Sequence, residues 1–343
     1  MSNRTTIKDI AKAANVSSAT VSYILNDAPN KAISEETRVL VRSLAQEMNY
    51  VPNTSARRLR TNRANCVAVR LSQTLMLPRY HSILQGLRSY LTPRGYSILL
   101  VNEDQSGGTA GCMYAYMSGQ VDGIIYISSD GTGLSQEEFA QVQERNIPLS
   151  AIDCMGDNAA VSSITYDYYA TSAIRLSHII QNGFRRILYL RPVYQDAKEI
   201  AREQGIRSAS LTYPGTSVEV YQMKAMDEEW QKASNFDQFV ASLHRDAFQE
   251  ARRKVLSVPP DTAVLAYSQE LQNIVMHILH AQHLAHPTHE TENWYLRGAS
   301  YHFPHYDAGV EAAASLLNAI KGEKDVRKLS LQPILDLTDP ELF

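Results

Sequence analysis

Apolar residues recur at helical spacing near the start of the chain. Ile7, Ile10, Ala11 and Ala14 fall on one face of a helix. Asn15 comes next, and asparagine tolerates the left-handed backbone conformation that a tight turn between two helices requires. We therefore predict a short helix that ends in a tight turn.

A second and a third helix are predicted after this turn. Ser17 or Ser18 can cap the second helix, which has an apolar inward face and a small, polar outward face. Ser34 is the predicted N-cap of the third helix, because two glutamates follow it in the first turn. The predicted inward residues are Val21, Ile24 and Leu25 on the second helix and Thr37, Leu40, Val41, Leu44, Ala45 and Met48 on the third, whereas Ser18, Ala19, Ser22, Tyr23 and Asn26 face outward.

The segment YVPNTSARRLR at residues 50–60 is unusual in composition. Pro52 suits a first helical turn, and the eight residues that follow predict about two turns of helix, which are too short to be stable in water. The segment contains small residues, basic residues and one leucine. This composition suits folding against a minor groove, with Leu59 between base pairs and the arginines on phosphates. The alternative is a flexible basic linker, just as the outward face of the second helix is either a DNA-reading surface or ordinary solvated surface.

Charge separates the start of the chain from the rest. Residues 1–63 contain ten Lys/Arg and five Asp/Glu, a net charge of +5, which leaves −8 for the remainder of a chain with net charge −3. A basic unit joined to an acidic one is the expected charge distribution of a nucleic-acid-binding module attached to another domain.

From Cys66 onward, short apolar runs alternate with helical spacing. This alternation predicts parallel sheets, and the pattern restarts after Ile164, so we predict two α/β lobes with a cleft between them. Ligands of open α/β sheets lie at the carboxyl ends of strands. The predicted strands are Cys66–Leu71, Ser97–Val101, Val121–Ser128, Leu149–Asp153, Ile187–Leu190 and Ala263–Ala266, and the predicted helices are His81–Leu91, Ala170–Gln181 and Phe239–Leu256.

Several functional classes lack their sequence signals. The N-terminus has no apolar signal core and no run is long enough to span a membrane, so we expect a cytoplasmic protein without membrane contact. Cys66, Cys112 and Cys154 are far apart in the sequence, which favours reduced thiols. We find neither a glycine-rich phosphate loop nor a nucleophile motif, and therefore expect no enzymatic activity and no cofactor.

The motifs TIKDIAKAANVS, ATVSYILN, ISEETR and YVPNTSARRL together resemble the DNA-binding head of the LacI/GalR family of bacterial transcription regulators. The runs ILQGLRSYLTPRGYSILL, VDGIIYIS and FPHYDAGVEAAASLLNAIKGE are similar to the effector core of that family, which has a periplasmic-binding-protein-like fold. The resemblance is good to about residue 192, weak over 193–296, and returns at 303–323. It implies a homodimer on a near-palindromic operator, with recognition helices in major grooves and paired hinge helices in the central minor groove.

We therefore predict a sequence-specific transcriptional regulator, a repressor that binds double-stranded operator DNA as a dimer. The expected organisation is an all-α helix-turn-helix domain over 1–50, a hinge helix and linker over 51–63, and an α/β two-lobed core over 64–343 that binds a small-molecule effector. The predicted DNA-binding residues are Thr6, Ile7, Ser17, Ser18, Ala19, Thr20, Ser22, Tyr23, Asn26, Lys31, Asn53, Ala56, Arg57, Leu59 and Arg60.

Two features of the head depart from the family pattern. Tyr23 stands where many members have an arginine that reads guanine, and tyrosine cannot make that bidentate contact. The loop DAPNKAI between Asn26 and Ser34 is longer than the common form, which changes the expected phosphate contact of Lys31. We therefore expect DNA shape to contribute more to recognition of the operator.

The candidate effector site departs further. By resemblance, Asp153 matches a pocket carboxylate and Asp167 an acidic position after the crossover between lobes. Ser268 replaces an aspartate that grips sugar hydroxyls, and either Glu199 or Arg202 stands near the place of a missing arginine. A site that binds several sugar hydroxyls leaves polar groups unpaired when its residues are replaced. We therefore expect a ligand other than a simple sugar, or none. The candidate effector-binding residues are Tyr80, Asp153, Asp167, Tyr267 and Ser268.

Histidines recur every third residue from His277 to His289. This spacing drifts around a helix, so a solvated helix is favoured over a metal or pH sensor, and no metal site is predicted. The alternatives to an effector-controlled repressor are a ligand-independent, metal-responsive or activating regulator, and a small-molecule binding receptor, which the core alone would allow.

Overall fold

The computed structural model of the chain contains two compact units, Met1–Arg63 and Ala64–Phe343, which are named here the head and the core. Each unit is described by itself. The structure describes residues 5–26, 33–51, 63–71, 78–102, 109–128, 134–154, 161–226, 243–268, 271–272, 274–275, 277–278, 299–323 and 326–337.

Three helices form the head around one small core. Asn15 adopts a left-handed conformation with φ of 54°, and the Val16 N–H bonds the Ala11 carbonyl at 3.0 Å, which closes the first turn. The predicted caps Ser17 and Ser34 are confirmed, since their side chains accept backbone N–H groups of Thr20 and Thr37. The helices are α1 (Ile7–Ala13), α2 (Ser18–Leu25) and α3 (Glu35–Glu47), and their buried residues are Ile10, Ala11, Ala14, Val21, Ile24, Val41 and Ala45.

Leu40 departs from the predicted buried stripe of α3. Its side chain is 47% exposed and lies beside exposed Val39, whereas Val41 is fully buried. The two short helices α1 and α2 cover Val41 and Ala45 fully and Leu44 and Met48 in part, so Leu40, at the margin of this stripe, stays in solvent.

The first lobe of the core is built on a six-stranded sheet with the order β10-β5-β4-β3-β1-β2. Every neighbouring pair is parallel, which confirms the predicted parallel sheet. The strands are β1 (Cys66–Leu71), β2 (Ser97–Asn102), β3 (Gly123–Ile127), β4 (Leu149–Ile152), β5 (Ser162–Tyr166) and β10 (Lys328–Leu331).

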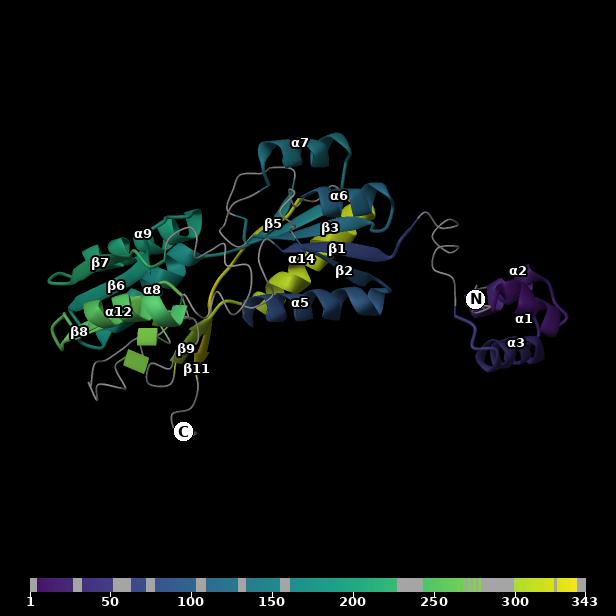
Figure 1. Cartoon of the computed structure of the whole chain (residues 1–343), viewed down its shortest axis with the longest axis horizontal. Coiled ribbons are helices and arrows are strands. Elements are labelled where there is room, and N and C mark those ends of the chain that lie inside the picture. Colours follow the sequence, from purple (N-terminus) through teal and green to yellow (C-terminus); the bar gives the residue numbers. More distant parts are fainter. Residues whose placement is uncertain are drawn as a thin grey trace. The chain divides into compact units, whose positions relative to one another are not determined.

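Helices cover both faces of this sheet (Figure 1). Val67, Val69 and Leu71 of β1 point toward α5 and α14, whereas Ala68 points toward α6 and α7, because side chains alternate along a strand. Burial on both faces explains the nearly continuous apolar sequence of these strands. The helices are α5 (Pro78–Leu91), continued by the 3₁₀ turn η1 (Thr92–Arg94), then α6 (Thr109–Met117), α7 (Gln136–Glu144) and α14 (His305–Ile320).

The second lobe is a smaller sandwich on the parallel sheet β7-β6-β8. One face packs against α8 and α9, and the other packs against η2 and α12. The sequence predicted β6, β8 and the helices α8 and α12, but no element was predicted for β7 or α9. The elements are α8 (Tyr168–Gln181), β6 (Arg186–Pro192), α9 (Ala197–Thr212), β7 (Ser217–Met223), the π-helical turn η2 (Leu243–Ala247), α12 (Phe248–Val255) and β8 (Thr262–Ala266).

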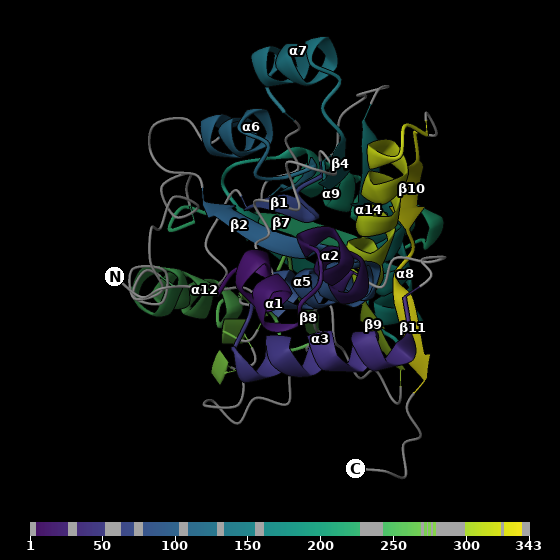
Figure 2. The same cartoon turned by 90° about the vertical axis from the view of Figure 1, so that its right-hand side faces the viewer.

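Segments far apart in the sequence meet where the chain passes between lobes. The Asp167 N–H bonds the Leu331 carbonyl at 3.0 Å, so the links after β5 and after β10 lie side by side. The strands β9 (Ala299–His302) and β11 (Ile334–Leu337) pair antiparallel, as Figure 2 shows. The C-terminal part of the chain thus completes the first lobe through α14 and β10. None of the described helices is long and apolar enough to cross a membrane.

The contact between α5 and α14 depends on two glycines. A Cβ atom on Gly86 would lie 2.0 Å from the Tyr306 carbonyl oxygen, and one on Gly309 would lie 2.2 Å from the Ile83 carbonyl oxygen. The two helix backbones therefore approach more closely than any larger residue permits.

Replacing Gly309 with alanine should push α14 away from α5 and lower the free energy of unfolding of the core by about 3 kcal/mol. Urea unfolding followed by circular dichroism measures the change. Glu311→Ala, in the same helix but in a partly exposed ion pair with Arg327, is the matched control and should change stability by less than about 1 kcal/mol. Equal effects of the two substitutions would contradict the packing argument.

Candidate functional site

The outward face of α2 is the first candidate site. Ser18, Ala19 and Asn26 are exposed and Tyr23 is 36% exposed, whereas Val21 and Ile24 on the opposite face are fully buried. The predicted division of this helix into an inward and an outward face is therefore confirmed. The exposed face consists of short side chains and one phenol, so the helix backbone can approach a DNA groove closely.

Several polar residues of the head hold the starts of its helices. The Thr6 hydroxyl donates to Asp9 at 2.7 Å, and together these residues form a reciprocal cap on α1. The Ser17 and Thr20 hydroxyls lie 2.8 Å apart, and the Asn26 amide donates to the Ser22 carbonyl at 2.7 Å. Ile7 packs against the head core. The predicted DNA-binding residues Lys31, Asn53, Ala56, Arg57, Leu59 and Arg60 lie outside the described residues.

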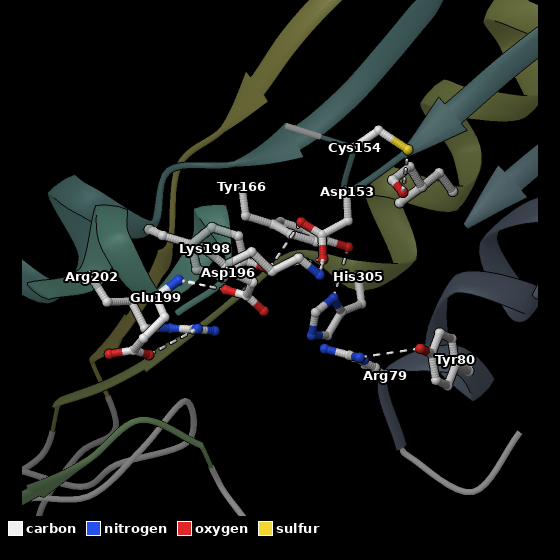
Figure 3. A network of polar contacts seen from close by, with 12 residues as sticks. Arg79, Tyr80, Asp153, Cys154, Tyr166, Asp196, Lys198, Glu199, Arg202 and His305 are labelled. Atoms are coloured by element: carbon white, nitrogen blue, oxygen red, sulfur yellow. Dashed lines mark hydrogen bonds and ion pairs between the residues drawn. The ribbon is translucent and has the colours of Figure 1, made fainter. Parts of the chain in front are cut away.

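The second candidate site lies between the two lobes of the core and centres on Asp153. This residue follows β4 in the left-handed region, with φ of 61°, and is 4% exposed. The Tyr168 hydroxyl donates to its two carboxylate oxygens at 3.0 and 2.9 Å. The Lys198 ammonium pairs with the same carboxylate (Figure 3). Lys198 comes from α9 of the second lobe, so this ion pair joins the two lobes.

Two arginines approach the same carboxylate and phenol. The guanidinium carbon of Arg202, on α9, lies 4.4 Å from the centre of the Tyr168 ring. Arg79, on α5, donates to the Tyr80 hydroxyl at 3.1 Å and interacts electrostatically with both Tyr168 and Asp153. The name interlobe cluster is used below for this set, which comprises Arg79, Tyr80, Asp153, Tyr168, Lys198 and Arg202.

Burial shapes the ionisation of the interlobe cluster. It lowers the pKa of the Lys198 ammonium, and the Asp153 carboxylate opposes that shift. Burial and the neighbouring Asp153 raise the pKa of the Tyr168 phenol well above its ordinary value, so the phenol remains a hydrogen-bond donor. Although burial disfavours its charge, Tyr80, Tyr168 and Asp153 together raise the pKa of Arg79.

Glu199 borders the interlobe cluster and is 1% exposed. The Tyr189 hydroxyl donates to it at 2.6 Å, and Arg202 lies 3.7 Å away. Burial raises the pKa of Glu199 from 4.5 to about 7, even though Arg202 and the Tyr189 hydrogen bond act in the opposite direction. A carboxyl group in the first turn of α9 therefore changes charge near neutral pH.

The structure brings together some of the candidate effector-binding residues and separates others. Tyr80 and Asp153 belong to the interlobe cluster, and the Tyr267 ring lies 6.0 Å from the Arg202 guanidinium carbon. Asp167 instead caps α8, accepting the Ala170 N–H at 2.8 Å and the Gln332 amide at 3.1 Å. The Ser268 hydroxyl accepts the Leu271 N–H at 3.4 Å.

Sequence reasoning missed Arg79 and Lys198, two members of the interlobe cluster, and favoured packing for Tyr168, whose cluster with Tyr166 and Tyr169 could also line a cleft. It considered both Glu199 and Arg202 for the place of the missing arginine and did not choose between them. Arg202 contacts the Tyr168 ring and Glu199 follows Lys198, so both lie next to partners of Asp153. One local signal concerned Lys198. Asp196 caps the start of α9, so Lys198 is placed in the first turn of that helix. Nothing in the local sequence connects that turn with Asp153, forty-five residues earlier.

The interlobe cluster has the features of a binding site, because its charged groups converge at the carboxyl end of β4, between the two lobes. Among the described residues, no three His, Cys, Asp or Glu side chains gather in a way that would hold a metal ion. Of the repeated histidines only His277 is described, and its ring lies 6.0 Å from that of Phe248. Cys66, Cys112 and Cys154 are free thiols.

The raised pKa of Glu199 predicts that stability falls as pH rises. The folded state holds the proton more tightly than the unfolded state, so stability is lost between the unfolded pKa of 4.5 and the folded pKa of about 7. The loss should reach about 3 kcal/mol. Urea unfolding at pH 5 and pH 8 should show this fall in the wild type and a smaller fall in Glu199→Gln.

Tyr189→Phe provides the second arm of this test. It removes the hydroxyl that donates to Glu199, which should raise the pKa of that carboxyl further and make the fall in stability larger than in the wild type. Identical pH dependence in the wild type and both variants would contradict the role of Glu199.

Comparisons with known proteins agree with this architecture. The family model "Bacterial regulatory proteins, lacI family" matches residues 6–53. The HTH-type transcriptional repressor PurR of Vibrio campbellii is 27% identical over 275 residues, covering 78% of this chain and 77% of the relative. Catabolite control protein A of Priestia megaterium is 27% identical over 214 residues, covering 62% of this chain and 63% of the relative.

Solved structures share the fold of both units. The lac repressor dimer bound to operator and the anti-inducer ONPF superposes with a TM-score of 0.74 at 19% identity, covering 99% of this chain and 100% of that one. A complex of the transcriptional regulator CelR with cellobiose gives a TM-score of 0.57 at 22% identity, with 98% and 100% coverage. The head motif, the two-lobed core and these relatives agree: residues 6–53 match the lacI family of bacterial regulatory proteins, and the chain as a whole is similar to PurR and has the fold of the lac repressor.

Proposed function

We propose that this protein represses transcription by binding a near-palindromic DNA operator as a homodimer, under the control of a small molecule that binds between the lobes of the core. The observation that carries the proposal is the family match over residues 6–53, which contains the exposed face of α2. The full-length relatives PurR and catabolite control protein A, and the operator-bound lac repressor dimer, support the same function.

DNA recognition rests on α2. Its fixed start at Ser17 and its buried side at Val21 and Ile24 hold the helix rigidly against the head core, so its exposed residues can be presented to base edges in one orientation. Ser18, Ala19 and Tyr23 are the residues we assign to base contacts. Residues 53–60 supply the proposed minor-groove contact, with Leu59 as the wedge.

Control by a ligand follows from the two-lobed core. A ligand that binds differently to open and closed lobes shifts the population of the two arrangements, and this changes how two heads are spaced on the operator. Ligand affinity and operator affinity are then linked reciprocally. A repressor of this kind acts on chromosomal DNA, so we place it in the cytoplasm.

The test is selection of bound sequences from a random duplex pool with the full-length protein. A two-fold symmetric consensus, bound with an affinity that falls steeply with salt, is the expected result. Binding without any enriched sequence, under both ligand-free conditions and in the presence of a metabolite extract, would refute sequence-specific regulation.

Tyr23 should set the preference at one base pair of each half-site. Tyr23→Ala should reduce discrimination at that position by about 1–3 kcal/mol, and Tyr23→Arg should create a preference for guanine there, because arginine, unlike tyrosine, can bond guanine in the bidentate manner. Competition binding with single-base operator variants measures both. Gln46→Ala, on the exposed side of α3, is the control and should leave the preference unchanged. The assignment fails if Tyr23→Arg keeps the wild-type consensus.

A further inference from the structure

The charges of the interlobe cluster discriminate between classes of ligand. Asp153 belongs to the first lobe and Lys198 to the second, and their side chains are 5% and 2% exposed. Any molecule that enters between the lobes at this point must separate the two charged groups. A buried charge that loses its partner is strongly unfavourable, and Asp153 keeps the Tyr168 hydroxyl when Lys198 moves away, so the ligand must above all replace the negative charge that Lys198 loses.

A neutral polyol such as a simple sugar satisfies these groups poorly. The two Asp153 oxygens already accept the Tyr168 hydroxyl, and the third bond to Asp153 comes from Lys198. A sugar hydroxyl that displaced Lys198 would separate a buried ammonium from Asp153, the carboxylate that stabilises its charge most, ahead of Asp196. Lys198 is therefore poorly compatible with a site in which aspartates bind sugar hydroxyls.

A cationic ligand fits still less well. It could pair with Asp153, but it would then lie beside Lys198, Arg79 and Arg202, all of which act on the Asp153–Tyr168 pair. Repulsion from these basic groups would exceed the attraction of one carboxylate.

An anion leaves the fewest groups without a partner. It can take over Lys198 and also reach the guanidinium groups of Arg79 and Arg202, while Asp153 keeps the hydrogen bonds from Tyr168. Two further carboxylates border the site, and both accept hydrogen bonds from within the protein, Asp196 from the Glu199 N–H at 2.7 Å and Glu199 from the Tyr189 hydroxyl at 2.6 Å. Arginine and lysine are the side chains that bind carboxylate and phosphate groups most strongly.

We propose that the effector is an anion, a phosphorylated or carboxylated small molecule, and that Lys198 selects it by occupying the carboxylate on which a neutral sugar would depend. Arg79 and Arg202 complete the anion site from the first and the second lobe. This inference rests on the proposed function, because it assigns a ligand class to the site through which operator binding is controlled.

The test uses the full-length protein and matched pairs of probes at constant ionic strength. Glucose 6-phosphate, inorganic phosphate and citrate are compared with neutral glucose by calorimetric titration. The expected result is saturable binding of at least one anionic probe and no binding of glucose. Tighter binding of glucose than of glucose 6-phosphate, or no binding of any anion by protein that still binds its selected operator, would overturn the proposal.

Asp153→Asn gives a change whose sign depends on the ligand class. The amide retains one acceptor oxygen of nearly the same shape but removes the negative charge, so an anion should bind about tenfold more tightly. A neutral polyol would instead lose its charged acceptor and bind more weakly. Weaker anion binding by this variant would contradict the proposal.

Removal of a basic group is the complementary test. Lys198→Met should weaken the bound anion about 10- to 100-fold. Arg202→Gln serves the same purpose if the first variant does not fold, because Arg202 is not the partner of Asp153. Arg186→Gln, in the exposed pair with Asp261 on the second lobe, is the matched control and should bind the anion as the wild type does. Equal affinity in all four proteins would show that the anion binds elsewhere and overturn the assignment.

The same protein separates failure of this inference from failure of the proposed function. Operator binding is measured on each sample independently of the probes. Protein that binds a specific operator but no anion leaves the repressor function standing and removes the ligand class. Protein that binds anions but selects no DNA sequence removes the repressor function.

Discussion

The ion pair between Asp153 and Lys198 is the interaction on which the core's two-lobed arrangement depends. It joins the end of β4 in one lobe to the first turn of α9 in the other, and both side chains are buried. Neither group can lose the other without leaving a charge in a low-dielectric environment. Such a pair contributes little net stability compared with apolar packing, but it strongly penalises any arrangement that separates the lobes without a substitute partner.

Local conformation places this pair. Asp153 follows a buried parallel strand and adopts the left-handed conformation, which an aspartate tolerates better than most residues. Lys198 follows the capping residue Asp196, so the start of α9 fixes its direction. The Tyr168 ring packs edge to face against both Tyr166 and Phe303, which are tilted toward each other, beside the buried carboxylate. Polar and aromatic groups from both lobes therefore define one site, which suits a core that must respond to what lies between its lobes.

The head follows a different physical logic. Its core is small and closed, and the surface that we propose for DNA recognition lies on the side of α2 that faces away from that core. Capping hydrogen bonds at Thr6, Ser17 and Ser34 fix the three helices with very few residues. A rigid small scaffold presents a short recognition surface at low entropic cost, whereas the large core provides the buried charges through which a second molecule can act.

The sequence by itself determined the local elements and the resemblance to the LacI/GalR family. Helical spacing, capping residues and the asparagine turn identified the head, and short apolar runs identified most strands of both lobes, because these signals depend on neighbours within one turn or one strand. The burial of Leu40 was predicted wrongly, since exposure depends on how much of α3 its partners cover. Tertiary structure alone decided that Lys198 meets Asp153 and that Gly86 meets α14. These contacts join residues distant in the chain, and no local pattern encodes which distant charge or backbone a side chain will meet after folding.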